Sequence, residues 1–109
     1  MCSTTAILNH LDFLYNIATS SKADWREHIK KASDEQVTLL IECLGNVSRF
    51  LDHIPQKEED LINNIVHAYV HSNNRDILLE HWEFVRSITA RILRVVYRAE
   101  LWCVMLNHG

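Results

Sequence analysis

The sequence predicts an all-α protein: a compact bundle of about five helices with a long C-terminal helix at about residues 75–106. Two observations favour this fold. The 109 residues include only two Gly and one Pro, which leaves few residues for hairpins or long loops. Apolar residues also recur at three- and four-residue steps along most of the chain, as on the buried face of amphipathic helices. We expect one helical domain over residues 1–109, because a chain of this length buries roughly two thirds of its unfolded surface.

Three helices are expected in the first half of the chain. The first is capped by Thr4 or Thr5 and ends in a polar cluster before Ser21, which caps the second. Ser33 has the spacing of a capping box and begins the third helix. The apolar stripe of this third helix continues until Pro55, which ends it by restricting the residue before it.

Two more helices are expected in the second half. Pro55 can occupy the first turn of the fourth, whose wide apolar face predicts packing against at least two neighbours. Asn73 and Asp76 resemble a cap for the long helix at about residues 75–106. Its apolar stripe repeats every seven residues, at Leu78, Val85, Ile92, Ala99 and Leu106, with Ile88, Val95 and Trp102 three positions further on.

The end of the long helix is the most unusual surface that the sequence predicts. Residues 101–106 read LWCVML, so every side of the helix is apolar where a monomeric domain usually becomes polar. Burying about 500 Å² of this surface would contribute on the order of 10 kcal/mol before association entropy is subtracted. Either this turn docks into its own bundle or it pairs with a second molecule. The candidate partner or dimer interface consists of Leu101, Trp102, Val104, Met105 and Leu106.

A second candidate surface is basic. No acidic residue lies between the first and last of four arginines on the side opposite the apolar stripe. This arginine face consists of Arg86, Arg91, Arg94 and Arg98, with Arg26, Lys30 and Lys31 as auxiliaries. It can hold phosphates of an RNA or DNA duplex, or it can be a solvated face paired with acidic residues such as Glu58. The net charge of −3 argues against indiscriminate nucleic-acid binding.

The sequence offers little for catalysis or metal binding. His67 and His71 lie four residues apart, so both imidazoles can reach one metal ion, but no motif supplies further ligands. We therefore predict no cofactor and no metal, with the pair of His67 and His71 as the alternative that the spacing leaves open. Cys43 lies beside an apolar stripe and Cys103 within residues 101–106, and burial disfavours the reactive thiolate form. With only Gly45 and Gly109 there is no glycine-rich phosphate loop, so we predict a non-enzymatic protein.

The sequence also predicts the compartment. The three cysteines are widely spaced and suggest no disulfide framework, which favours a reducing, intracellular location in the cytoplasm or nucleus. The first 20 residues lack the basic and apolar regions of a signal peptide. No apolar run approaches the roughly 18 residues that a membrane span requires.

A resemblance covers about half of the chain. The stretch HIKKASDEQVTLLIECLGNVSRFLDHIPQKEEDLI, within residues 11–65, resembles a short helical protein of adintovirus-like and Polinton-like DNA elements of animals. Those proteins continue into strongly basic tails, whereas residues 67–109 of this chain carry modest charge. The resemblance implies a virus-derived protein and names no mechanism.

These observations predict a helical-bundle interaction protein that self-associates, as a homodimer, or engages a partner's helix through its long C-terminal helix. The alternative is a small dimeric protein that binds the backbone of double-stranded RNA or DNA through the arginine face of that helix. The two alternatives differ in whether the arginine face binds phosphate or is only solvated.

Overall fold

Every secondary-structure element in the described part of the chain is helical, which confirms the predicted all-α fold. The computed structural model describes the backbone of residues 3–108 and the side chains of residues 3–98. The elements are α1 (Thr4–Asn9), α2 (Leu11–Thr19), α3 (Lys22–Lys31), α4 (Asp34–Gly45), a 3-10 turn η1 (Val47–Arg49), α5 (Gln56–Ser72), α6 (Asp76–Glu80) and α7 (Trp82–His108).

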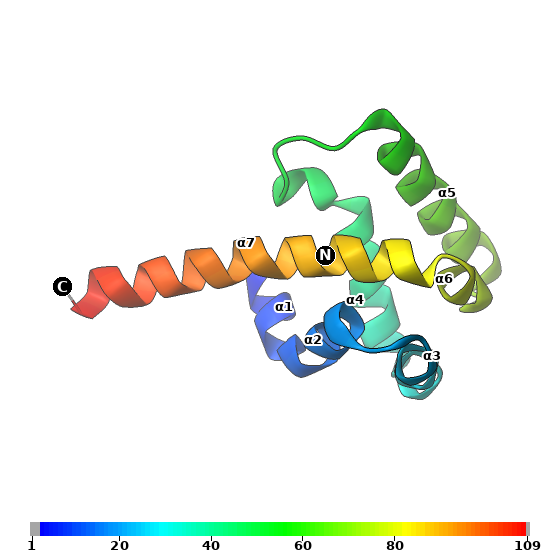
Figure 1. Cartoon of the computed structure of the whole chain (residues 1–109), viewed down its shortest axis with the longest axis horizontal. Coiled ribbons are helices and arrows are strands. Elements are labelled where there is room, and N and C mark those ends of the chain that lie inside the picture. Colours follow the sequence, from blue (N-terminus) through cyan, green and yellow to red (C-terminus); the bar gives the residue numbers. More distant parts are fainter. Residues whose placement is uncertain (1–2, 109) are drawn as a thin grey trace.

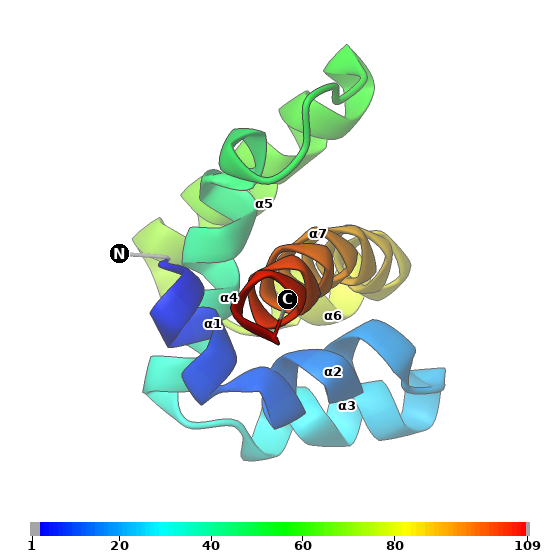
Figure 2. The same ribbon diagram turned by 90° about the vertical axis from the view of Figure 1, so that its left-hand side faces the viewer.

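The other helices are arranged around α7. Helices α1, α2 and α3 lie on one side of it, and α5 lies on the other (Figure 1). In a view along α7, α2 and α4 lie against two adjacent sides of this helix, while no described helix covers its remaining side (Figure 2). The most extensive packing of α7 is against α2, followed by α4. Because α2 and α4 meet α7 from different directions, α7 has one buried side and one open side.

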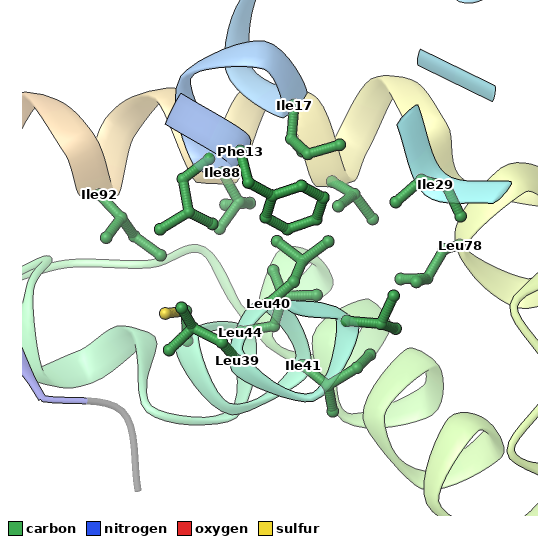
Figure 3. Packing of buried hydrophobic residues seen from close by; sticks show 14 of the residues in the cluster. Phe13, Ile17, Ile29, Leu39, Leu40, Ile41, Leu44, Leu78, Ile88 and Ile92 are labelled. Carbon is green, nitrogen blue, oxygen red and sulfur yellow. The ribbon is translucent and has the colours of Figure 1, made fainter. Parts of the chain in front are cut away.

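The hydrophobic core lies where α2, α4 and α7 meet, and Figure 3 shows the side chains that fill it. These include Phe13 and Ile17 of α2, Leu40 and Leu44 of α4, and Ile88 and Ile92 of α7, all of them buried. Trp25 of α3 is fully buried as well, and its Nε1–H donates to the carbonyl oxygen of Ile17 at 2.9 Å. No buried side-chain nitrogen or oxygen among the described residues lacks a hydrogen-bond partner, so this core carries no unsatisfied polar group.

Two of the predicted helices are each divided at a histidine. The predicted first helix bends at His10 into α1 and α2, and the predicted long helix bends at His81 into α6 and α7. Both histidines have similar backbone angles, φ −120° and ψ 30° at His10 and φ −110° and ψ 32° at His81. The bends let Ile7 and Leu78 enter the same core as the longer helices that follow them, and both are 0% exposed. Tertiary packing therefore overrides a continuous apolar pattern at these positions.

The third predicted helix is shorter than expected. We predicted that it continues to Pro55, but α4 ends at Gly45. Asn46 ends it, because both its backbone N–H and its side-chain amide donate to the carbonyl oxygen of Glu42, the latter at 2.7 Å. A side chain that satisfies the last carbonyls competes with continuation of the helix. The apolar residues beyond η1, Leu51 and Ile54, still pack against the core from a non-helical segment.

The predicted caps differ in outcome. At Ser33 the capping box with Gln36 is complete, with both reciprocal hydrogen bonds at 3.1 Å. Ser21 precedes α3 as predicted but makes no side-chain cap hydrogen bond to the backbone. Asn74, not Asn73, accepts from the backbone N–H of Asp76, at 2.9 Å. Asn73 instead ends α5 in the left-handed conformation, with φ 54°, a role to which asparagine is suited.

Candidate interaction site

The C-terminal helix has a buried face that agrees with the predicted stripe at most positions. Its buried residues are Val85, Ile88, Thr89, Ile92, Leu93 and Val96. The seven-residue repeat predicted Val95 in the core, but Val96 is buried and Val95 is only half-buried. A straight α-helix drifts by about 20° per heptad relative to a seven-residue repeat, so the buried stripe moves to the next residue. Val96 is the last buried residue among the described side chains.

Beyond this point α7 extends past the rest of the molecule. Its helical backbone continues to His108, and Figure 1 shows its C-terminal turns projecting beyond all other elements. The radius of gyration is 14.0 Å and the longest dimension 48 Å, against about 13 Å expected for a spherical domain of this length. The projecting part of α7 therefore has no described helix beside it.

The predicted partner interface lies on this projecting part. The side chains of Leu101, Trp102, Val104, Met105 and Leu106 are outside the described residues, whereas their backbone is helical. At about 100° per residue, Ala99, Cys103 and Leu106 continue the side of α7 that is buried in the bundle. Leu101 and Met105 continue the open side. The sequence thus places apolar residues on both sides of a helix that leaves the bundle.

The arginine face is only partly available, because the bundle itself engages two of its members. Nη1 of Arg91 donates to both carboxylate oxygens of Glu58, at 3.0 and 2.9 Å. Arg86 lies over the ring of Trp82, with its Cζ 6.0 Å from the ring centroid. Arg94 and Arg98 are exposed. Their side chains therefore remain as the freely accessible cations of the arginine face.

The predicted basic auxiliaries are on another helix. Arg26, Lys30 and Lys31 are exposed on α3, whose main packing partner is α2. Nζ of Lys31 lies 3.9 Å from a carboxylate oxygen of Glu27, one turn earlier on the same helix. No described contact connects these residues with the arginine face. The structure gives no reason to treat the two groups as one continuous basic surface.

A shallow hollow lies where α2 meets the open side of α7, and the sequence pattern did not reveal it. Its volume is about 400 Å³, and it is lined by Ala18, Trp82, Glu83, Arg86, Ser87 and Ala90. Small side chains at Ser87 and Ala90, three residues apart on one side of α7, leave the space open. The two small residues can be seen in the sequence, but they line a hollow only because α2 packs beside them.

His67 and His71 lie side by side on α5. Their ring centroids are 4.1 Å apart with an edge-to-face angle of 71°, and both residues are exposed. Among the described residues, no group of three or more His, Cys, Asp or Glu side chains is arranged to hold a metal ion. The pair therefore stands without a third such ligand in the part of the chain that the structure describes.

Comparison with known proteins returns nothing: no family model, curated protein or solved structure matches this chain. The resemblance to proteins of adintovirus-like elements accordingly stays a prediction. A search of the described helices found none long and apolar enough to cross a membrane.

Proposed function

We propose that this chain is a non-enzymatic interaction protein that forms a homodimer through residues 101–106 of α7. In the dimer, the projecting ends of two α7 helices pair side by side. A virus-derived origin, as the resemblance over residues 11–65 implies, is part of this proposal.

The observation that carries the proposal is the course of α7 beyond Val96. The helix leaves the bundle (Figure 1), and the sequence of its projecting part is LWCVML rather than the polar residues of a solvated helix end. Large apolar patches are rarely left exposed on soluble monomers. Because apolar residues lie on every side of this segment, a second helix that packs along it buries surface whichever side it takes.

A second copy of the chain is the partner that fits best. Each copy supplies an identical apolar segment, and a two-fold dimer brings the same patch of both subunits together. Burial of about 500 Å² contributes on the order of 10 kcal/mol, and association costs at least about 4 kcal/mol. At most about 6 kcal/mol remains, which corresponds to a dissociation constant of tens of micromolar or weaker. The dimer is therefore expected to dissociate on dilution.

Sedimentation velocity over a dilution series tests the proposal. Wild-type protein is expected to change from dimer to monomer as concentration falls from hundreds of micromolar to below roughly 10 μM, whereas Trp102→Glu remains monomeric. Val70→Glu is the matched control, because Val70 is 69% exposed on α5 and lies far from the projecting end. A wild-type monomer at every concentration, or dimerisation that Val70→Glu weakens as much as Trp102→Glu, refutes the proposal. Circular dichroism verifies that each variant is folded.

A second candidate function is binding of a nucleic-acid backbone. It is supported by Arg94 and Arg98, which are exposed one turn apart where α7 leaves the bundle. In a dimer that pairs these ends, both copies bring their two arginines close together. Binding of duplex RNA or DNA should then weaken as salt rises, because phosphate contacts release counterions.

Fluorescence anisotropy with a labelled duplex at two salt concentrations tests this second function. Arg94→Gln with Arg98→Gln is expected to abolish binding, whereas Arg26→Gln on α3 leaves it intact. No binding by the wild type at low salt would eliminate this function without affecting the dimer proposal.

A further inference from the structure

The exposed histidine pair of α5 is far from the projecting end of α7 and plays no part in the proposed dimer. His67 and His71 are four residues apart, so their Cβ atoms lie on one face of the helix about 5–6 Å apart. Their ring centroids are already 4.1 Å apart. Two imidazoles held this close are the minimum arrangement for chelating one metal ion.

Buried residues hold the helix beneath the pair against the core. Helix α5 spans 17 residues, and Ile65 and Tyr69, on either side of His67, are buried in the core. Because these buried residues fix the rotation of α5, they also fix the direction in which the histidines leave it. Both histidines therefore lie on the same face of α5 before a metal ion binds.

The ring geometry requires only a small adjustment to bind a metal. With metal–nitrogen bonds of about 2.1 Å, two imidazoles on one ion have centroids roughly 4.5–5 Å apart. The present edge-to-face contact at 71° and 4.1 Å is slightly tighter. Rotation about χ2, which is a broad torsion for histidine, turns a nitrogen of each ring toward the same point. Both side chains are exposed, so nothing packed around them opposes this motion.

We propose that His67 and His71 form a two-ligand binding site for a late first-row divalent cation of the nickel, copper or zinc class. Imidazole nitrogen is a preferred ligand of these ions. No cluster of three His, Cys, Asp or Glu ligands occurs among the described residues, so water completes the coordination. The ion bridges two successive turns of α5 and stabilises its helical form, because the unfolded chain does not hold the two rings together.

Isothermal titration calorimetry with Ni²⁺ and the purified full chain tests the site. The wild type is expected to bind one Ni²⁺ through the pair. His67→Asn and His71→Asn each weaken that binding by roughly tenfold or more, because the second ligand acts at high effective concentration. His53→Asn, which changes an exposed histidine in the non-helical segment before α5, leaves the affinity unchanged.

A spacing variant separates chelation from mere histidine content. Asn64 is exposed on α5, and combining Asn64→His with His67→Asn keeps the number of histidines but separates the pair by seven residues, about 10.5 Å along the helix. One ion cannot bridge that distance, so this variant should bind as weakly as His67→Asn alone. Affinity equal to wild type in the spacing variant, in His67→Asn or in His71→Asn overturns the proposal, as does a wild type that binds no Ni²⁺. Unchanged far-ultraviolet circular dichroism ensures that each comparison is between folded chains.

Discussion

Arg75 links three helices, and its replacement should destabilise the protein. It lies directly before α6. Its Nη1 donates to the carbonyl oxygens of Ile29 and Ala32, both at 2.7 Å, at the C-terminal end of α3. Its Nη2 donates to Oδ1 of Asp34 at 2.9 Å, in the first turn of α4. The guanidinium thus sits where α3 ends and α4 begins, and Arg75→Met removes all three bonds while keeping most of the side-chain volume.

The expected loss of stability depends on how well each of the three hydrogen bonds is shielded from water. The Arg75 side chain is 25% exposed, whereas that of Asp34 is 93% exposed, so the ion pair contributes less than about 1 kcal/mol. The two carbonyl bonds are charge-assisted and part-buried, and such bonds contribute about 1.5–3 kcal/mol each before the discount for water that reaches the site. A cation also interacts favourably with the negative end of the α3 dipole. We expect Arg75→Met to lower the free energy of unfolding by about 2–4 kcal/mol.

Urea unfolding followed by circular dichroism and by tryptophan fluorescence, to which the buried Trp25 contributes, measures this loss. For a chain of this size it corresponds to a fall in the thermal midpoint of roughly 10 °C or more. Asp34→Asn is the control, since it leaves both carbonyl bonds in place and removes the exposed ion pair together with one acidic charge in the first turn of α4. This variant should cost about 1 kcal/mol or less. The reasoning is wrong if Arg75→Met costs less than about 0.5 kcal/mol, or if the two variants are equally destabilised.

Three further predictions concern stability and are measured by the same unfolding experiments. Gly45→Ala should raise the free energy of unfolding by about 0.5–1 kcal/mol, because a Cβ there meets only the γ carbons of Val66, at 3.9 Å; a loss of stability would show that the last turn of α4 needs glycine. Ser33→Ala breaks the capping box of α4 and should cost about 1 kcal/mol, with no effect as the contradicting result. Trp25→Phe removes buried volume and the hydrogen bond to the carbonyl of Ile17, so a loss of about 2–3 kcal/mol is expected, and a neutral outcome would mean that the core repacks freely.

Gly45 also shows how much of the structure can be inferred from the local sequence. A glycine within a helix is costly and is typical of a close approach by another helix, and α5 does pass Gly45 through Val66. The approach is at ordinary van der Waals distance, so it does not require glycine. Helix α4 ends at this residue because Asn46 supplies the cap, and the apolar residues that suggested a longer helix pack from the loop instead. Apolar spacing reports which residues are buried more reliably than it reports the backbone that carries them.

Some features of the candidate site can be inferred from the sequence, and others depend on the tertiary structure. The apolar character of residues 101–106 and the presence of four arginines on one helix are properties of the sequence alone. The sequence also offered Glu58 as an acidic partner for the arginine face, and Arg91 does bind it, 33 residues away. That Arg91 is the arginine which Glu58 binds, and that Arg86 lies on Trp82, depends on where α5 begins and on how α7 starts. The hollow beside Ala18 likewise exists only because α2 packs against α7.

The sequence by itself determined the all-α class, the complete cap at Ser33, the start of a helix at Pro55 and the apolar side of the last helix, since propensity, capping and periodicity act between residues within about one turn of each other. Only the tertiary structure decided that the chain bends at His10 and His81 and that Val96 rather than Val95 enters the core. It also decided that Arg75 joins residues more than 40 positions away in the chain. These features arise from packing between segments that are distant in the sequence. A local sequence pattern does not specify which distant segment a residue will contact.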